Sequence, residues 1–169
     1  MKILIAFAAW LAVTTSAVFA QQPAFFDPLL DRFAGNWVLQ GTIAGKTTTH
    51  GVAAEWVPGH QYLRFHEISR EKNDKGQAQY EANVYIGWIQ PDGEYGCAWL
   101  DTWGGVTAQS LARARREGDS IPFVFKDKDH SLFRTTFICD RGADSWEWRM
   151  DAEQNGTTKP FTRVKLVRK

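Results

Sequence analysis

The chain lacks an excess of charge of either sign. Its 169 residues include 20 Lys and Arg against 19 Asp and Glu, a formal net charge of +1 at neutral pH. Proteins that bind nucleic acid or an anionic membrane surface usually carry a basic excess, because the phosphate groups they meet are negative. The balance therefore argues against nucleic acid as a partner.

The chain also lacks the motifs of common catalytic and metal sites. It has no G-x-S-x-G nucleophile elbow and no glycine-rich phosphate loop leading into a helix. The H-x-x-x-H spacing of a metal-binding pair is absent among its four histidines, His50, His60, His66 and His130. The sequence therefore predicts no catalytic residue, no metal ligand and no cofactor.

Cysteine is scarce, with only Cys97 and Cys139 in the chain. Both fall in strand-like segments, and the two strands would not be neighbours in a simple meander. The pair could form one disulfide in an oxidising compartment, or the two residues could stay as buried thiols. The sequence leaves both alternatives open.

The first twenty residues have the pattern of a secretory signal peptide. Lys2 precedes an apolar segment over residues 3–13, and Val18-Phe19-Ala20 is a small-x-small cleavage site. The apolar segment is too short for a spanning helix. We therefore expect residues 1–20 to be removed and the mature chain to begin at Gln21. The protein is then expected to be periplasmic or secreted, with no integral membrane span after cleavage.

What the chain does contain is alternation with the period of a β-strand. One arm of the segment 80–103 has apolar side chains at every second position, namely Tyr80, Ala82, Val84, Ile86 and Trp88. The other arm places five side chains on one face, namely Tyr95, Cys97, Trp99, Asp101 and Trp103. The turn residues 90–93 lie between the arms, so the segment predicts a long antiparallel hairpin.

The rest of the chain repeats this pattern after a short helix. A face formed by Phe26, Leu29, Leu30 and Phe33 predicts a helix within residues 21–33, with Asp27 as its N-cap. Strands are expected at 37–43, 48–57, 61–70, the two arms of 80–103, 106–116, 121–125, 132–140, 145–151 and 161–168. This predicts an all-β fold, an antiparallel meander barrel of about ten strands, as a single domain over residues 21–169.

Several short motifs resemble a known family. Gly35-Asn36-Trp37 resembles the G-x-W signature of lipocalins and other calycins, and the wider pattern resembles the bacterial family called domain of unknown function 1579. The matching segments are residues 30–37, 56–63, 86–101 and 162–169. The resemblance implies a calycin-like barrel, similar to lipocalins and fatty-acid-binding proteins, that binds a ligand. It also implies a cation–π contact between Trp37 and either Arg163 or Arg168.

A haem cofactor is not expected. The haem barrel nitrobindin resembles this chain in its opening and carries an axial His late in its sequence. This chain has no His after His130.

Eight residues are predicted to contact a ligand. Tryptophans could line a pocket for a flat apolar ligand, or they could fill the core. Fatty-acid-binding relatives hold a carboxylate with inward Arg and Tyr, so by resemblance such residues become candidates here. The sequence does not fix which face of 61–70 and 132–140 points inward. The predicted set is Tyr62, Arg64, His66, Trp88, Trp99, Asp101, Arg134 and Trp148.

Three functions remain open from the sequence. The first is binding of a small apolar or amphipathic ligand in the barrel lumen. The second is an isomerase or cyclase with Asp101 or His66 as proton carrier. The third is a ligand-free interaction module of the cell envelope. A lumen of about 300 Å³ or more would favour the first two. A carboxylate and a His within hydrogen-bond reach inside it would favour the enzyme. The oligomeric state is not predicted.

Overall fold

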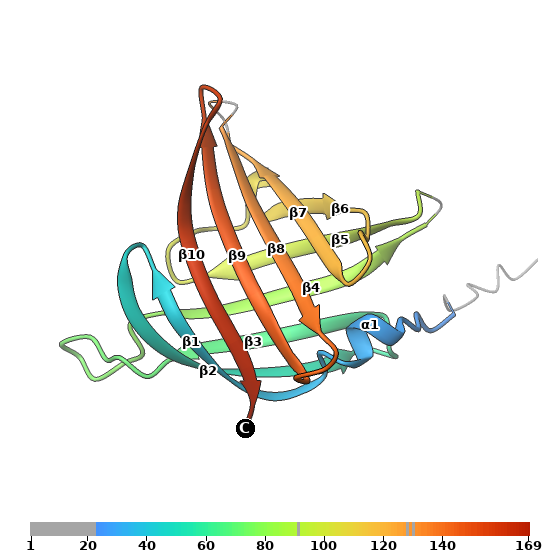
Figure 1. Cartoon of the computed structure of the whole chain (residues 1–169), viewed down its shortest axis with the longest axis horizontal. Coiled ribbons are helices and arrows are strands. Elements are labelled where there is room, and N and C mark those ends of the chain that lie inside the picture. The colour runs from blue at the N-terminus through green and yellow to red at the C-terminus, as the bar shows by residue number, and fades with distance from the viewer. Residues whose placement is uncertain (1–22, 91, 128, 130) are drawn as a thin grey trace, which may run out of the picture.

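The computed structural model describes residues 23–90, 92–127, 129 and 131–169. It shows a closed antiparallel barrel of ten strands (Figure 1). Each strand pairs with its neighbour in sequence, and β1 closes the barrel by pairing with β10, which confirms the predicted all-β meander. The strands are β1 (Gly35–Ile43), β2 (Lys46–Val57), β3 (Tyr62–Ser69), β4 (Glu81–Ile89), β5 (Glu94–Asp101), β6 (Leu111–Ala114), β7 (Ser120–Lys126), β8 (Leu132–Asp140), β9 (Ser145–Gln154) and β10 (Thr157–Arg168).

Strand β6 is much shorter than the expected segment 106–116. The residues before it form a single 3-10 turn, η1 (Ala108–Ser110). The Ser110 hydroxyl donates to the Gly105 carbonyl at 3.1 Å and accepts from the Thr107 N–H at 3.2 Å. These local bonds compete with the ladder bonds of a strand, so pairing begins only after the turn.

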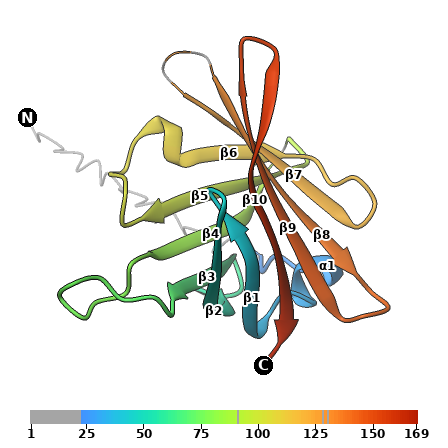
Figure 2. The same ribbon diagram turned by 60° about the vertical axis from the view of Figure 1, so that its left-hand side comes forward.

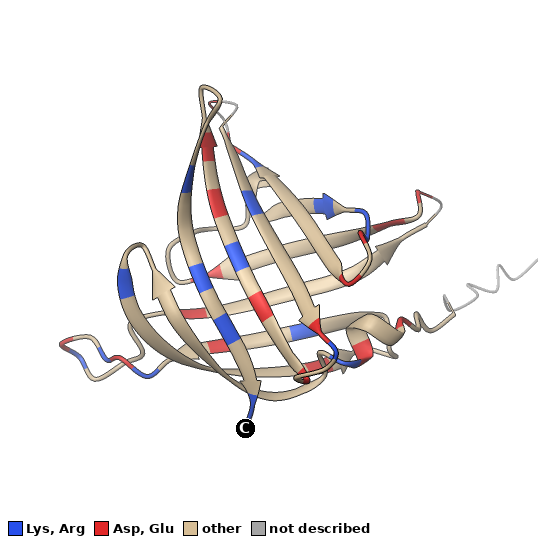
Figure 3. Cartoon of the chain, in the orientation of Figure 1, with Lys and Arg blue, Asp and Glu red and all other residues tan. Residues whose placement is uncertain are grey.

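Side-chain alternation decides what lies inside the barrel. In β9, Trp148 and Met150 are buried, whereas Arg149 between them is exposed. Together, β8, β9 and β10 carry charged residues of both signs (Figure 3), all of them exposed or half-buried. Some of these charges pair across strands, as between Arg163 and Asp151, where the nitrogen–oxygen distance is 2.5 Å.

The N-terminal helix is shorter than predicted. Helix α1 (Pro28–Asp31) has four residues, and Asp27 caps it as expected by accepting from the Leu29 and Leu30 N–H groups at 2.7 and 3.1 Å. Leu29 and Leu30 are fully buried. Phe26, expected on the same face, is 71% exposed because it precedes the cap.

Helix α1 and a group of aromatic rings close one end of the barrel. Figures 1 and 2 show α1 beside the end at which β8 turns into β9. Phe33 stacks on Trp146 with ring centroids 4.0 Å apart and meets Phe65 edge-on at 4.5 Å. Phe137 extends the packing to Trp148 at 4.7 Å. Aromatic side chains therefore fill this half of the interior.

The expected contact between Trp37 and an Arg of the last strand is present, and the partner is Arg168. Its guanidinium carbon lies 4.0 Å from the Trp37 ring centroid. Its nitrogens also donate to the Ala34 and Arg32 carbonyls. Gly35 permits this approach, because its φ is +131° and a Cβ there would lie 2.3 Å from Arg168 Nη1.

The remaining expectations concern the cysteines and the N-terminus. Cys97 in β5 and Cys139 in β8 are both free and buried, and burial raises the pKa of the Cys97 thiol. The expected signal peptide and the start at Gln21 lie outside the described residues. Among the helices that the structure describes, none is long and apolar enough to cross a membrane.

Candidate functional site

Three of the predicted ligand contacts lie on the outer face of β3. Leu63 and Phe65 are fully buried, so the residues that alternate with them point away from the interior, namely Tyr62, Arg64 and His66. Arg134 lies on the outer face of β8, where it is exposed. The two arginines therefore do not face the lumen, as holding a carboxylate there would require.

The outward charged residues have partners on neighbouring strands. The pairs are Arg64 with Glu55, His66 with Glu81 at 2.7 Å, and Arg134 with Glu153 at 2.9 Å. Exposed pairs of this kind contribute little to stability. They form part of the solvated outer surface.

Two of the tryptophans predicted to contact a ligand pack against other aromatic side chains inside the barrel. Trp148 is 1% exposed and contacts Trp99, with ring centroids 5.2 Å apart. It forms the boundary between the filled half and the open half of the barrel. Trp88 lies toward the end closed by α1, stacked on Phe25 at 5.4 Å.

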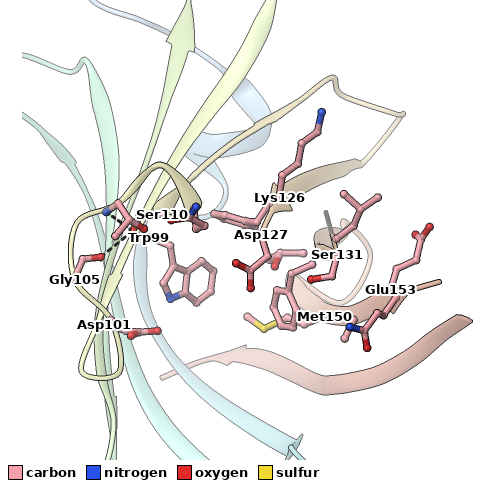
Figure 4. A pocket seen from close by; sticks show the side chains of 18 residues that line it. Trp99, Asp101, Gly105, Ser110, Lys126, Asp127, Ser131, Met150 and Glu153 are labelled. Atoms are coloured by element: carbon pink, nitrogen blue, oxygen red, sulfur yellow. Dashed lines mark hydrogen bonds between the residues drawn. The ribbon is translucent and has the colours of Figure 1, made fainter. Parts of the chain in front are cut away.

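The open end of the barrel contains two adjoining cavities. The first cavity has a volume of about 730 Å³ and is lined from β5, η1, β7, β8 and β9 (Figure 4). The second cavity has a volume of about 570 Å³ and is lined mainly from β1, β2, β3, β5, β10 and the loop before β4. Four residues line both cavities, namely Trp99, Asp101, Phe133 and Met150. Two predicted residues, Trp99 and Asp101, thus meet at the shared wall.

The first cavity is apolar in its depth. Trp99 and Met150 approach it from opposite walls in Figure 4. Phe125 and Phe133 add aromatic surface. The ammonium end of Lys126 extends away from Asp101 toward solvent. A molecule in this cavity would meet aromatic and thioether surface from these residues, and polar and charged side chains over the rest of the lining.

The second cavity contains a buried His–Glu pair. His50 of β2 and Glu67 of β3 are 3% and 2% exposed, and His50 Nδ1 lies 2.5 Å from Glu67 Oε1. A carboxylate at Nδ1 fixes the orientation of an imidazole and leaves Nε2 for a second partner. In this arrangement the Glu67 carboxylate orients the His50 imidazole, which is the base of the pair.

Thr48 links this pair to a second carboxylate. Its hydroxyl oxygen lies 2.8 Å from His50 Nε2 and 3.2 Å from Glu71 Oε2. A neutral His50 accepts the Thr48 proton at Nε2. An imidazolium instead donates to Thr48, whose hydroxyl then donates to Glu71. The two arrangements differ by one proton and keep the same heavy-atom positions.

Hydrogen bonds keep Glu71 in its carboxylate form. Burial raises the pKa of Glu71, but hydrogen bonds from its own N–H, the Thr49 N–H and the Thr48 hydroxyl lower the pKa by more. Glu71 therefore remains an acceptor for Thr48.

Tyr80 connects the cluster to the shared wall. Its ring stacks on His50 with centroids 5.7 Å apart. Its hydroxyl donates to Asp101 Oδ2 at 3.3 Å and accepts from Trp99 Nε1 at 3.2 Å. Burial, with the nearby Glu67 and Asp101 carboxylates, raises the pKa of the Tyr80 hydroxyl. Tyr80 therefore stays protonated.

Two buried hydroxyls of residues that line the cavities have no hydrogen-bond partner among the described residues. Thr135 lines the first cavity and Thr162 the second, and each is 1% exposed. Strand register places both opposite Met150, one on each side of the shared wall. Buried polar groups are normally satisfied, and here both hydroxyl oxygens are themselves buried, so neither adds polar surface to the cavities.

Sequence reasoning did not single out this polar cluster, although a signal for part of it exists. His50 alternates with the apolar residues Val52 and Ala54, and Glu67 alternates with Leu63 and Phe65. The same kind of alternation points to Asp101. Nothing in the sequence marks Thr135 or Thr162, because threonine is ordinary in strands.

Comparison with other proteins does not extend this description. No protein-family model matches the chain, and no curated protein matches it. Within the described ranges, no three His, Cys, Asp or Glu side chains are arranged to hold a metal ion.

Proposed function

We propose that this protein is a secreted or periplasmic barrel that binds a small amphipathic molecule at its open end. The observation that carries the proposal is the pair of adjoining cavities, of about 730 and 570 Å³. Small-molecule sites typically measure about 300–1,000 Å³. A packed, ligand-free module would have no need for this volume.

The lining supports an amphipathic occupant. Apolar surface comes from Trp99, Phe125, Phe133 and Met150, and the carboxylate of Asp101 adds a polar group in the same cavity. Binding sites commonly combine apolar walls with a few polar groups that orient the ligand.

We also propose that the chain belongs to the calycin-like family called domain of unknown function 1579. The Trp37–Arg168 contact supports this, because it joins the G-x-W motif to the last strand. Membership would fit ligand binding, and it names no ligand.

The binding proposal is tested with N-phenyl-1-naphthylamine, a neutral apolar fluorescent probe. Titration into the purified protein is expected to saturate at one equivalent with increased probe emission. Met150→Trp should weaken binding about tenfold, because a larger side chain then occupies the shared wall. The matched control, Leu111→Trp, places the same ring at a residue that is 61% exposed on the outer face and should leave affinity unchanged. No saturable binding, or equal effects of the two changes, would contradict the proposal.

The His50–Glu67 pair favours a second candidate function, acid–base catalysis on a lipophilic substrate. His66, one expected proton carrier, lies outside the barrel, whereas His50 lines the second cavity next to a carboxylate. A base oriented in this way can remove a proton next to a carbonyl group and return it at another position, as an isomerase does.

This candidate is tested with 2-tetralone, a flat apolar ketone, in deuterated buffer. Wild-type protein is expected to exchange the protons next to the carbonyl faster than buffer does, as followed by NMR. His50→Gln should lower the protein-dependent rate about a hundredfold or more, and His66→Gln should leave it unchanged. No exchange above buffer would remove the enzyme candidate and leave the binding proposal standing.

A further inference from the structure

The charged side chains that line the second cavity are mainly acidic. Glu67, Glu71 and Asp101 face two basic residues, Lys46 and His50. His50 already lies between two of these carboxylates, 2.5 Å from Glu67 and 4.0 Å from Glu71. Lys46 is exposed at the rim. The interior of the cavity is therefore richer in negative than in positive charge.

Asp101 is the acid placed to meet a ligand in either cavity. It lines both, and its oxygens accept from the Trp103 N–H at 2.8 Å and the Tyr80 hydroxyl at 3.3 Å. No Lys, Arg or His of the described chain forms an ion pair with it. Its charge is thus available to a cationic group.

Aromatic rings surround the space next to Asp101. Trp99 lines the shared wall, and Tyr80 and Trp103 line the second cavity with their ring centroids 4.9 Å apart. The second cavity is bounded further by Phe133 and Phe161, whose centroids are 5.3 Å apart. Aromatic faces attract cations through their quadrupoles, and tryptophan does so most strongly.

We propose that the open end of the barrel takes an amphiphile whose polar head is a cationic nitrogen, with its apolar part in the aromatic depth of the cavities. This rests on the proposed binding function and names the class of its ligand. Inward arginines would have favoured a ligand with a negative head group. Arg64 and Arg134 instead lie outside the barrel and the acidic residues lie inside, which favours a positive head group.

The test compares three ligands that share one decyl chain: decyltrimethylammonium, decanol and decanoate. Each is titrated below its micellar concentration against protein loaded with N-phenyl-1-naphthylamine, and displacement gives the affinity. The ammonium is expected to bind at least about tenfold more tightly than decanoate. Asp101→Asn should weaken the ammonium about tenfold, because the trimethylammonium group interacts with the carboxylate through charge alone, and it should change decanol by less than about twofold.

Glu81→Gln is the matched control. Glu81 neighbours Ala82, the pairing partner of Asp101, and its exposed side chain bonds His66 on the outer face. Replacing Glu81 also removes one negative charge, but on the outer face of the barrel. The preference for the ammonium over decanol and decanoate should therefore not change. Retained decanol binding shows that Asp101→Asn is folded. If that variant does not fold, Trp103→Leu, at a side chain that is 67% exposed, should weaken the ammonium about threefold.

The possible results distinguish the proposed cationic head group from the proposed binding function. Equal affinity for the three ligands, or tighter binding of decanoate, would overturn the cationic head and leave binding intact. Ammonium preference that survives both Asp101→Asn and Trp103→Leu would overturn the assigned contacts. Failure of every probe to bind would overturn both proposals.

Discussion

Replacing Trp148 with alanine is expected to lower the free energy of unfolding by about 3–5 kcal/mol. The side chain is 1% exposed and packs against Phe137 and Trp99, with ring centroids 4.7 and 5.2 Å away. Its indole N–H has no partner among the described residues. The loss is therefore one of packing, without a broken hydrogen bond, and we expect the lower part of the range.

The control for this change is Glu147→Ala on the opposite face of β9. Glu147 contacts Arg149 through two hydrogen bonds of 2.7 and 2.6 Å, and an exposed pair of this kind is worth about 0.5 kcal/mol or less. Urea denaturation of both variants gives the comparison. Equal, small losses of stability in the two variants would mean that the apolar face of β9 is not buried.

Gly41→Ala is expected to cost about 2–5 kcal/mol. Gly41 has a φ of +150°, and a Cβ there would lie 2.2 Å from the Arg163 carbonyl oxygen and 2.8 Å from Val164 Cα. Both obstacles are backbone atoms of β10, so relief requires the β1–β10 pair that closes the barrel to move apart.

Gly51→Ala in β2 is the matched control. A Cβ at Gly51 would meet nothing within 4 Å, so the change should alter stability by less than about 1 kcal/mol. Thermal and urea unfolding of the two alanine variants measure the difference. A Gly41→Ala protein as stable as Gly51→Ala would contradict the close β1–β10 approach.

The sequence predicts the fold because apolar side chains recur clearly at every second position in the segments that form the main strands. The strand around Trp148 alternates large apolar residues with charged ones, and the first arm of the hairpin from Tyr80 to Trp103 has an apolar side chain at every second position. The register confirms both as paired strands. The predicted helix is longer than α1 because its apolar face continues to Phe33, whereas the helix ends at Asp31 and residues 32–33 form a turn.

The orientation of β3 was harder to predict. Arg64 and His66 suggested a ligand site by residue type, whereas burial follows the alternating Leu63 and Phe65. Each outward charge finds a partner on the next strand, and such a partner is visible only once pairing is known.

The polar cluster depends on cross-strand register, which the sequence does not display. His50 and Glu67 are brought together because β2 pairs with β3 so that His50 lies opposite Ser69 and Val52 opposite Glu67. Thr135 and Thr162 flank Met150 only because three strands align at that level. A shift of one residue in either ladder would turn these side chains to the outer face.

The most direct test of the central claim, a ligand-binding cavity at the open end, is native mass spectrometry of the purified protein with the neutral probe N-phenyl-1-naphthylamine. We predict one bound molecule per chain for wild type and for Leu111→Trp, and a strongly reduced adduct for Met150→Trp. Unliganded wild-type protein throughout, or an adduct of equal intensity in all three proteins, would contradict the claim.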